Sequence, residues 1–448
     1  MELKRKIHES IREWYFGSNK ALLISGARQV GKTYTVRSSL KELGCSFVEV
    51  NLIETPLAVD VLSGCTTVDE LILGLSTLVN KPIVKGKTVI FIDEAQKYKE
   101  LVTRIKFFVE EGSFRYVLSG SLLGIELTNL ISAPVGYLTT YEMFPLDFEE
   151  FLQITNINAE VLLHVKQALA KRTPVLDAVH EKLMALFKQY LVVGGMPEAV
   201  VKFAETYDLN AVSKIHSNIL KLYRLDFTQY ESGEKKLILG NIFDMVPAEL
   251  LKQNRRFIVS DLKKGLHFER IENSFLWLRN AGVVISVFNA TEPRFPLKLS
   301  EKQSLFKLYL SDVGLLTTIF GMGAKSRILA GDSTFNGGGI YENAVVQALH
   351  SKGYRIYYYN SKRLGELDFV IEHHGSIVPI EVKSGKDYTA HSALNHCLES
   401  REYGMEEAFV FASCNVEKRG KATYLPIYMT GFLEAESELY VPIERISF

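Results

Sequence analysis

Residues 26–33 read Gly26-Ala27-Arg28-Gln29-Val30-Gly31-Lys32-Thr33, the pattern G-x-x-x-x-G-K-[ST] of a phosphate-binding loop. The two glycines allow successive backbone N–H groups to face the phosphates of a nucleotide. Lys32 neutralises phosphate charge, and the Thr33 hydroxyl is a ligand for Mg²⁺. An apolar run at residues 21–24 predicts a buried strand before the loop, and residues 32–43 predict a helix after it. Because a nucleotide site needs this order of strand, loop and helix, the stretch predicts such a site rather than a chance glycine turn.

A second motif lies at residues 88–94, where the strand pattern Thr-Val-Ile-Phe-Ile ends in Asp93 and Glu94. Two acidic residues at a strand end also occur on plain surfaces, but the phosphate-binding loop upstream favours a Walker B strand. In this interpretation Asp93 holds the Mg²⁺ shell, and Glu94 polarises the water that attacks the γ-phosphate.

A third strand is predicted at residues 114–118 and is followed by Ser119-Gly120-Ser121. In ATPases whose glutamate follows the Walker B aspartate, such a strand lies between the loop strand and the Walker B strand. Ser121 or Ser119 is then a candidate sensor of the γ-phosphate. The alternative is a turn of small residues without a function. A last strand is expected at about residues 135–140.

The length and composition limit the classes of protein that the chain can form. At 448 residues it is expected to contain three domains, at residues 1–151, 152–305 and 306–448. Its 52 basic and 52 acidic residues exclude the overall positive charge of a bulk nucleic-acid binder, so any contact with DNA is expected to be local. The four cysteines form no C-x-x-C pair, which argues against a zinc site or a disulfide framework and favours the cytoplasm. The sequence predicts neither a membrane span nor a signal peptide.

The middle of the chain is predicted to be helical and then to form a winged helix. Residues 152–252 show the three- and four-residue apolar spacing of helices. The pattern then predicts helices at 260–265 and 270–281 and strands at 283–288 and 296–299, the order of a winged helix. Basic residues are in modest excess here, so a lid on the ATPase or a subunit contact is the alternative to a DNA-binding role. They are Lys252, Arg255, Arg256, Lys263, Lys264, Arg270 and Arg279, against Asp261, Glu269 and Glu272.

The C-terminal third is predicted to contain a helix and a hairpin. The helix is expected at residues 340–352, and the glycine triplet at 337–339 is interpreted as its flexible start. The hairpin is expected to pair residues 365–371 with residues 377–383. The two histidines in the turn His373-His374-Gly375-Ser376 are interpreted as solvated residues.

Four polar residues are expected to meet on these elements. Antiparallel pairing would bring Asp368 near Glu381 and Lys383, which share one face of their strand because side chains alternate. Glu342 can approach from the helix. Three carboxylates beside one amine suit phosphodiester hydrolysis, in which the carboxylates hold one or two Mg²⁺ ions and Lys383 steadies the attacking hydroxide. The alternative is that Glu381 and Lys383 merely end an ordinary strand.

Seven stretches of the chain resemble the AAA-type ATPase family in which an AAA_14 domain is followed by a C-terminal domain of unknown function, DUF4143. They are GARQVGKT at 26–33, FIDEAQ at 91–96, LSGS at 118–121, FPLDFEEF at 144–151, GGMPEA at 194–199, KLYLSDVGLL at 307–316 and PIEVKSG at 379–385. The resemblance covers nearly the whole chain. It implies an ATP-binding P-loop domain, a helical and winged-helix middle, and a PD-(D/E)xK nuclease-like fold. At the nuclease positions it implies Glu342, Asp368, Glu381 and Lys383.

The chain departs from the family at one place. Many members carry Gly-Arg shortly before the Pro-Leu-x-Phe-x-Glu-Phe segment, where this chain has Pro134-Val135-Gly136-Tyr137. An arginine for the γ-phosphate is therefore missing there, and Arg115 and Arg224 are substitutes that the sequence does not rank. Because an arginine supplied in trans contributes about 10³-fold or more to turnover, the monomer is expected to be a slow ATPase or mainly a nucleotide-operated switch.

The predicted fold class is α/β, with an ASCE/AAA-type P-loop NTPase sheet, a helical and winged-helix middle and a restriction-endonuclease-like domain. The predicted function is that of an Mg²⁺-dependent ATPase whose nucleotide state positions the winged helix and the nuclease-like domain on duplex DNA. ATP rather than GTP is inferred from the family, because the chain has no guanine-reading Asn-Lys-x-Asp motif. One alternative is a regulatory ATPase whose nuclease-like fold is inactive and contacts proteins. Another is a DNA-binding regulator without significant hydrolysis. A second copy of the chain or another protein is a candidate partner.

Overall fold

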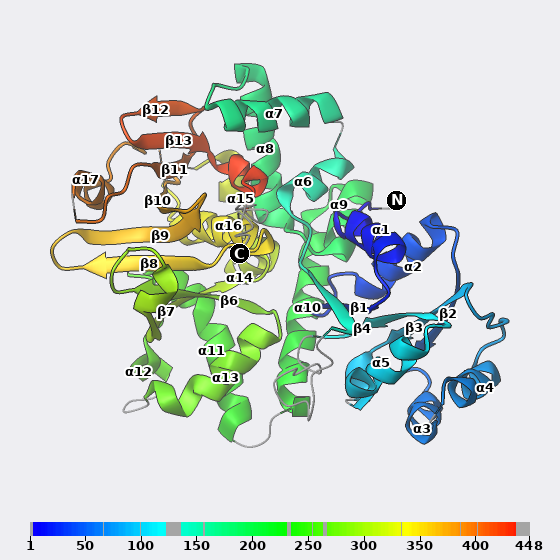
Figure 1. Ribbon diagram of the computed structural model, residues 1–448. Helices are drawn as coiled ribbons and strands as arrows, with labels where there is room; N and C mark the ends of the chain where they lie inside the picture. Colours follow the sequence, from blue (N-terminus) through cyan, green and yellow to red (C-terminus); the bar gives the residue numbers. More distant parts are fainter. Residues whose placement is uncertain are drawn as a thin grey trace, which may run out of the picture.

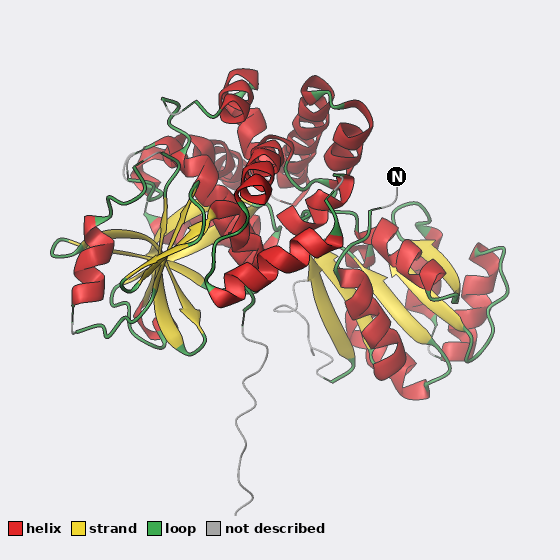
Figure 2. Cartoon of the chain, turned by 90° about the horizontal axis from the view of Figure 1, so that it is seen from above, coloured by secondary structure: helices red, strands yellow, loops and turns green. Residues whose placement is uncertain are grey.

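Two β-sheets organise the chain, and helices lie between and around them (Figures 1 and 2). The computed structural model describes residues 3–65, 67–98, 100–121, 136–155, 157–230, 234–252, 254–262, 267–332, 334–385, 387–400 and 402–435. No helix within these ranges is long and apolar enough to span a lipid bilayer.

The N-terminal sheet has the strand order β2-β3-β4-β1-β5, and all its neighbouring strands run parallel. Its strands are β1 (Ala21–Gly26), β2 (Ser46–Asn51), β3 (Thr88–Asp93), β4 (Arg115–Ser119) and β5 (Leu138–Met143). The predicted position of β4, between the loop strand β1 and the Walker B strand β3, is confirmed. The last strand extends to Met143 because it pairs with β1 along all of β1. Val135, where the sequence predicts its start, lies outside the described residues.

Helices cover both faces of this sheet and bury its apolar side chains. They are α1 (Ile7–Gly17), α2 (Lys32–Glu42), α3 (Leu57–Gly64), α4 (Val68–Leu78) and α5 (Glu100–Glu111). One apolar cluster contains Leu23 of β1 and Leu71 of α4, and a second contains Leu22 of β1 and Val36 of α2. Successive residues of β1 therefore face opposite layers, as a central parallel strand requires.

The C-terminal sheet has eight strands in the order β12-β13-β11-β10-β9-β8-β6-β7. They are β6 (Val284–Ala290), β7 (Glu301–Leu310), β8 (Ile356–Ser361), β9 (Gly365–His373), β10 (Ser376–Val382), β11 (Ala408–Ala412), β12 (Glu417–Arg419) and β13 (Ala422–Pro426). The predicted hairpin of β9 and β10 is antiparallel, and Pro379 pairs with Val370. Helices α16 (Gly338–Ser351) and α17 (Ser392–Glu399) pack against this sheet.

The region predicted as a winged helix shares its strands with the C-terminal sheet. Helices α12 (Val259–Leu262) and α13 (Phe268–Asn280) are present, and residues 263–266 lie outside the described residues. Strand β6 pairs with β7 and also, in parallel, with β8. The predicted strand at 296–299 is wrong, because Pro296 has no N–H for a ladder and leads into the 3₁₀ helix η5 (Leu297–Ser300). The predicted boundary between residues 305 and 306 falls inside β7.

A group of helices joins the two sheets. Its members are α6 (Phe148–Phe151), η4 (Leu152–Ile154), α7 (Ala159–Lys171), α8 (Asp177–Val193), α9 (Pro197–Thr206), α10 (Leu209–Tyr230), α11 (Glu234–Leu251), α14 (Val313–Phe320) and α15 (Met322–Ala330). Helix α10 packs against α9, α11 and α14 and stands between the two sheets (Figure 1). It is therefore placed to contact both halves of the molecule.

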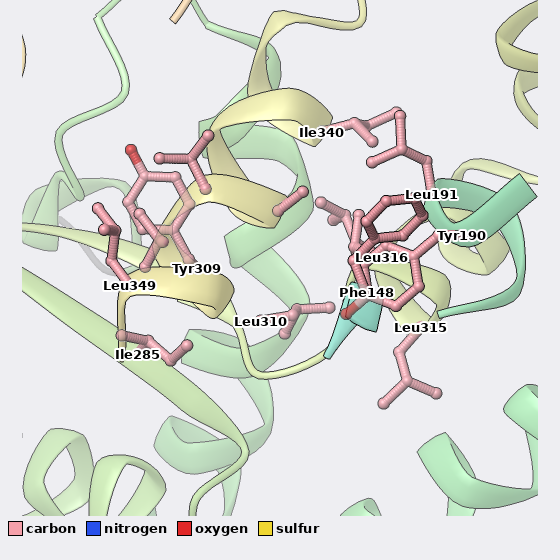
Figure 3. Packing of buried hydrophobic residues seen from close by; sticks show 14 of the residues in the cluster. Phe148, Tyr190, Leu191, Ile285, Tyr309, Leu310, Leu315, Leu316, Ile340 and Leu349 are labelled. Atoms are coloured by element: carbon pink, nitrogen blue, oxygen red, sulfur yellow. The ribbon is translucent and has the colours of Figure 1, made fainter. Parts of the chain in front are cut away.

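The largest hydrophobic core runs from α6 through these helices to the C-terminal sheet. Figure 3 shows Phe148 and Tyr190 packed near Leu315, and Tyr309 near Leu349. Because each fully buried large apolar side chain contributes roughly 1.5–3 kcal/mol, this shared core holds the middle and C-terminal parts together.

Three of the stretches that carry the family resemblance meet at one backbone junction. A Cβ on Gly195 would lie 2.0 Å from the carbonyl oxygen of Leu146, and one on Gly194 would lie 2.3 Å from Asp312 Oδ1. The N–H of Gly195 donates to Asp312 Oδ2 at 2.6 Å, and the N–H of Leu146 donates to the carbonyl of Gly195 at 2.7 Å. Burial raises the pKa of Asp312 to about 6, although backbone N–H groups oppose this. Gly194 and Gly195 therefore allow the FPLDFEEF, GGMPEA and KLYLSDVGLL stretches to pack closely against one another.

Replacing Gly195 by alanine is expected to destabilise the protein by about 3 kcal/mol or more, because the obstructing atom belongs to the backbone and moves little. The free energy of unfolding in urea measures this effect. The matched control is Gly240→Ala in α11, where a new Cβ meets nothing within 4 Å. There alanine is expected to be neutral or to stabilise the helix by about 0.5–1 kcal/mol. Equal stability of the Gly195 variant and the wild type would contradict the packing role.

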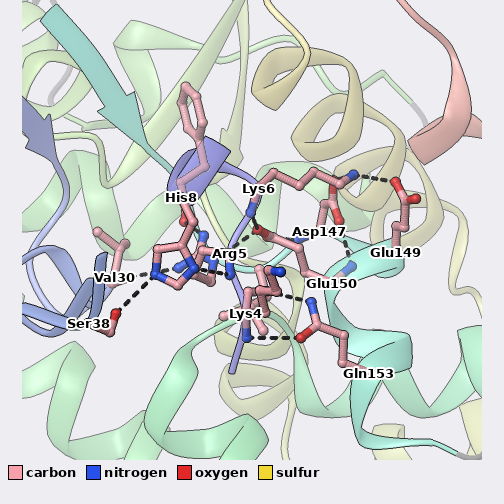
Figure 4. A network of polar contacts seen from close by, with 12 residues as sticks. Lys4, Arg5, Lys6, His8, Val30, Ser38, Asp147, Glu149, Glu150 and Gln153 are labelled. Atoms are coloured by element: carbon pink, nitrogen blue, oxygen red, sulfur yellow. Dashed lines mark hydrogen bonds and ion pairs between the residues drawn. The ribbon is translucent and has the colours of Figure 1, made fainter. Parts of the chain in front are cut away.

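The N-terminal segment ties the phosphate-binding loop to α6 (Figure 4). The buried Arg5 side chain donates to the carbonyl of Val30 in the loop at 3.1 Å and to Glu150 Oε1 at 3.0 Å. Asp147 and Glu150 form a capping box at the start of α6, and Lys6 Nζ lies 2.6 Å from Asp147 Oδ2. The loop is thus supported from outside its own strand and helix.

Candidate functional site

The phosphate-binding loop turns sharply between β1 and α2, and its two glycines have backbone angles that favour glycine. Gly26 has φ 148°, and a Cβ there would lie 2.3 Å from the carbonyl oxygen of Met143. Gly31 has φ 91° at the start of α2. Lys32 donates to the carbonyls of Gly26 and Ala27 at 3.0 and 2.8 Å. Burial lowers the pKa of Lys32 to about 8, while Glu94 and Asp93 act in the opposite direction.

Asp93 ends β3 directly beside the loop and collects three hydrogen bonds. Thr33 Oγ1 donates to Asp93 Oδ2 at 2.9 Å, and Asn51 Nδ2 donates to the same oxygen at 3.1 Å. Ser119 Oγ donates to Asp93 Oδ1. Asn51 was not predicted as a site residue, although it ends the predicted strand β2 and pairs with Asp93 in the register of β2 and β3.

Glu94 and Ser121 lie just beyond these strand ends. Glu94 has φ 56°, and its Oε2 accepts a hydrogen bond from Gln96 Nε2. Ser121 is buried, and among the described residues its hydroxyl has no hydrogen-bond partner. Ser119 donates to Asp93, so Ser121 is the serine of this strand end whose hydroxyl has no partner among the described residues.

The arrangement fits a nucleotide with Mg²⁺. Lys32 is buried, and in the described part of the chain no carboxylate forms an ion pair with it, so phosphate oxygens would provide its counter-charge. Thr33 Oγ1 and Asp93 Oδ2 are adjacent oxygens, the ligand type that Mg²⁺ prefers. The buried Ser121 hydroxyl, which has no partner among the described residues, is the remaining polar group at this strand end.

A cavity of about 620 Å³ adjoins the loop. Its lining comes from the N-terminal segment, the start of α2, helix α9 and helix α10, and it is mostly apolar. The lining residues include Leu3, Arg5, Gly31, Tyr34, Pro197, Val201 and Ile215. An apolar cavity beside a phosphate site suits a flat organic group attached to the phosphates.

The two arginines proposed as substitutes for the missing one do not reach the loop within this chain. Arg115 begins β4, pairs with Val89 at the start of β3, and lies 5.1 Å from the ring centre of Tyr15. It therefore sits at the opposite end of the strands from Asp93. Arg224 on α10 forms an ion pair with Asp244 at 2.6 Å.

A different arginine, Arg28, lies within the phosphate-binding loop and contacts helix α10. Its Nε lies 2.9 Å from Asp226 Oδ2, and the Tyr223 hydroxyl donates to the Arg28 carbonyl at 3.2 Å. Asp226 is buried. The loop and α10 are therefore held together by a side-chain and a backbone contact.

The four polar residues predicted for the C-terminal domain come together on α16, β9 and β10. Lys383 Nζ lies 3.2 Å from Glu381 Oε2, and Asp368 Oδ2 accepts the N–H of Val382 at 2.9 Å. Burial and the neighbouring Asp368 raise the pKa of Glu381 well above its ordinary value, while Lys383 opposes this. Burial, then Asp368, raises the pKa of Glu342 to about 7.

Three further residues of this cluster were not predicted. Arg255 Nη1 lies 2.5 Å from Glu342 Oε1, and the Tyr309 hydroxyl donates to Glu342 Oε2 at 3.0 Å. Lys307 is fully buried and lies 2.7 Å from Glu366 Oε1. Lys307 and Tyr309 share one face of β7, because side chains alternate along a strand. The polar residues at positions 307 and 309 of the KLYLSDVGLL stretch were therefore the sequence signal for this face.

The cluster does not fit the metal site that the resemblance implies. Among the described residues, no three His, Cys, Asp or Glu side chains are arranged to hold a metal ion together. Glu342, Asp368 and Glu381 are the residues that would bind the metal ion. Two of them form ion pairs with protein cations instead: Glu342 with Arg255, and Glu381 with Lys383.

Two interpretations of this region are corrected. His373 is not a solvated turn residue: it ends β9, is buried, and its Nδ1 lies 2.8 Å from the Tyr354 hydroxyl. Burial and then His374 lower the pKa of His373 to about 4. The glycine triplet is not merely a flexible helix start. A Cβ on Gly339 would lie 2.3 Å from the Leu250 carbonyl oxygen, so the triplet permits close packing of α11 on α16.

The strand order and the loop geometry define a P-loop NTPase domain of the AAA type. Residues 18–152 match the family model AAA_14, described as an AAA domain. Residues 184–326 match DUF8612 and residues 337–429 match DUF4143, both described as domains of unknown function. The chain therefore carries the AAA_14 and DUF4143 domains that its motifs resemble.

Several solved structures are similar to the chain. A Walker-type ATPase of Pyrococcus abyssi is 15% identical with a TM-score of 0.42, over 71% of this chain and 96% of that chain. The Thermotoga maritima RuvB Holliday junction branch migration motor is 15% identical with a TM-score of 0.28, over 66% and 91%. Cdc6p from Pyrobaculum aerophilum is 13% identical with a TM-score of 0.24, over 73% and 95%. No curated protein matches the chain.

Proposed function

We propose that the chain binds and hydrolyses Mg²⁺-ATP at the phosphate-binding loop and uses the nucleotide state to position its C-terminal half. The observation that carries this proposal is the hydrogen bond of 2.9 Å between Thr33 and Asp93, beside the buried Lys32. Bound Mg²⁺ supplies charge neutralisation at the phosphates. Lys32 binds phosphate oxygens, and Glu94 polarises the attacking water. Thr33 and Asp93 would hold the Mg²⁺ ion and its water shell.

The base of the nucleotide is assigned to the cavity beside Gly31. Its mostly apolar lining from Leu3, Tyr34, Pro197 and Val201 supports a flat base, and the adjacent loop supports attached phosphates. Because α9 and α10 contribute to the lining, nucleotide in this cavity would bridge the N-terminal sheet and the joining helices.

Helix α10 is the element that we propose as the reporter of nucleotide state. It contacts the loop through Asp226 and Tyr223, and it packs against α11 and α14 on its other sides. Phosphates that reorient Arg28 would change these contacts and so the position of α10. The helix connects to the C-terminal sheet through the shared core.

The test is a steady-state ATPase assay with ATP or GTP, with Mg²⁺ or EDTA, and over a range of protein concentrations. Hydrolysis of ATP that EDTA abolishes supports the proposal. A specific activity that rises with protein concentration would support a homo-oligomer that supplies an arginine in trans. Unchanged turnover in EDTA, or a clear preference for GTP, would contradict the assignment of an Mg²⁺-ATP site.

A second candidate function is cleavage of duplex DNA by the DUF4143 domain. The observation in its favour is the pair Glu381 and Lys383 beside Asp368, which provides a cation and carboxylates for phosphodiester hydrolysis. Binding of DNA through its phosphates would weaken steeply with added salt.

Replacing Lys383 by alanine is expected to abolish cleavage of supercoiled and linear DNA in Mg²⁺ or Mn²⁺, because the charge beside the reacting phosphate is lost. Gel electrophoresis of the DNA, with and without ATP, measures the loss. Lys386→Ala, three residues along the chain, is the control. If Lys32→Ala deregulates cleavage, the nuclease is linked to the ATPase. If wild type cleaves no DNA under any condition but hydrolyses ATP, the domain instead serves a regulatory ATPase as a protein-contact surface.

A further inference from the structure

Arg255 reaches into the carboxylate cluster from the connector between α11 and α12. Its Nη1 atom lies 2.5 Å from Glu342 Oε1, and the exposed fractions of the two side chains are 20% and 2%. Glu342 is also bound by the Tyr309 hydroxyl at 3.0 Å. Glu342 therefore has one oxygen committed to a guanidinium and the other to a phenol.

The connector that carries Arg255 is fixed on both sides. Before it, the end of α11 packs so closely on α16 that a Cβ on Gly339 would lie 2.3 Å from the Leu250 carbonyl oxygen. A Cβ on Gly338 would lie 2.7 Å from Arg255 Nη2, so the guanidinium lies directly against the start of α16. After it, the N–H of Phe257 donates to the Phe306 carbonyl at 2.9 Å, and the two rings stack with centroids 5.5 Å apart. The guanidinium is therefore held in the cluster by its surroundings.

The charges around Glu342 are arranged as an ion-pair network. Arg255 faces Glu342, and Lys383 faces Glu381 at 3.2 Å. Both oxygens of Glu342 already have a partner, so a divalent ion bound by this carboxylate would have to displace one of them, and two cations beside one carboxylate repel each other strongly. We infer that Arg255 is a built-in counter-ion that occupies the cation position of the DUF4143 carboxylate cluster and must leave before a divalent metal ion binds there.

This inference deepens the proposed nuclease function, and it concerns metal binding rather than cleavage. Arg255 lies on the connector that follows α11, so a movement of this connector would pull the guanidinium away from Glu342. Helix α11 packs against α10, the helix that contacts the phosphate-binding loop. A shift of α10 would therefore be passed through α11 to the connector and to the ion pair between Arg255 and Glu342.

The experiment is a titration of the nucleotide-free full chain with Mn²⁺, in which the six-line electron paramagnetic resonance signal reports free ion. Arg255→Gln is expected to create one Mn²⁺ site that binds at least about tenfold more tightly than the wild type, because a competing unit charge is removed. Asp368→Asn in the same variant is expected to remove that site. Arg256→Gln, the neighbouring arginine in the connector, is the matched control and is expected to bind Mn²⁺ as the wild type does.

Two outcomes would overturn the inference. One is an Asp368-dependent Mn²⁺ site of equal affinity in the wild type and in Arg255→Gln. The other is a folded Arg255→Gln variant without any Asp368-dependent site. Circular dichroism establishes folding, and Arg255→Met, which retains the aliphatic part of the side chain, replaces the glutamine variant if that variant does not fold. Because the readout is metal binding without DNA or ATP, a failed nuclease assay leaves the result of this titration unaffected.

Discussion

Replacing Lys32 by alanine is expected to abolish ATP binding. The wild-type ammonium is buried beside the loop and donates to the carbonyls of Gly26 and Ala27, and phosphate oxygens would replace these acceptors. ATP at about 100 times its Kd stabilises the wild type by about 2.7 kcal/mol, and the variant is expected to show none of this stabilisation. Thermal unfolding with and without Mg²⁺-ATP measures the difference.

The variant is expected to remain folded without nucleotide. Burial lowers the pKa of Lys32 to about 8, below its ordinary value, so keeping the ammonium charged at pH 7 costs folding free energy. Alanine removes this cost, which separates loss of binding from loss of structure. Lys41→Ala, an exposed position on the same helix α2, is the control and is expected to retain full stabilisation by ATP. Full nucleotide-dependent stabilisation of Lys32→Ala would mean that the loop is not the ATP site.

The geometry of the proposed ATP site could be anticipated in large part because its residues are neighbours in the sequence. Lys32 and Thr33 follow the loop glycines directly, and Asp93 and Glu94 end one apolar strand, so short motifs specify them. The position of β4 followed from the class of ATPase that those motifs indicate. The hairpin of β9 and β10 was predictable for a similar reason, since alternation and a short turn specify an antiparallel pair.

Contacts between distant segments could not be predicted in the same way. Apolar periodicity indicates which face of an element is buried, but it does not indicate which element covers that face. Arg255 lies 87 positions before Glu342 in the chain, and Arg28 lies 198 positions before Asp226. Strand β6 was predicted correctly as a strand, yet its place beside β8 depends on long-range pairing.

Replacing Glu94 by glutamine is expected to lower ATP turnover by about 10²–10⁴-fold while ATP binding is retained. The amide preserves the shape of the side chain but cannot accept a proton from the attacking water. Lys32, Thr33 and Asp93 are unchanged, so stabilisation by Mg²⁺-ATP in thermal unfolding is expected to equal that of the wild type. Single-turnover hydrolysis of ATP measures the chemical step apart from binding.

Glu100→Gln, at the exposed start of α5, is the matched control and is expected to turn over ATP as the wild type does. Normal turnover of Glu94→Gln would show that another group activates the water. Loss of ATP binding in the same variant would show that Glu94 supports the loop rather than the chemistry. Because Gln96 donates a hydrogen bond to Glu94, a partial loss of turnover in Gln96→Ala would identify that bond as the one that orients the carboxylate. The Lys32 and Glu94 variants together therefore separate the binding of ATP from its hydrolysis.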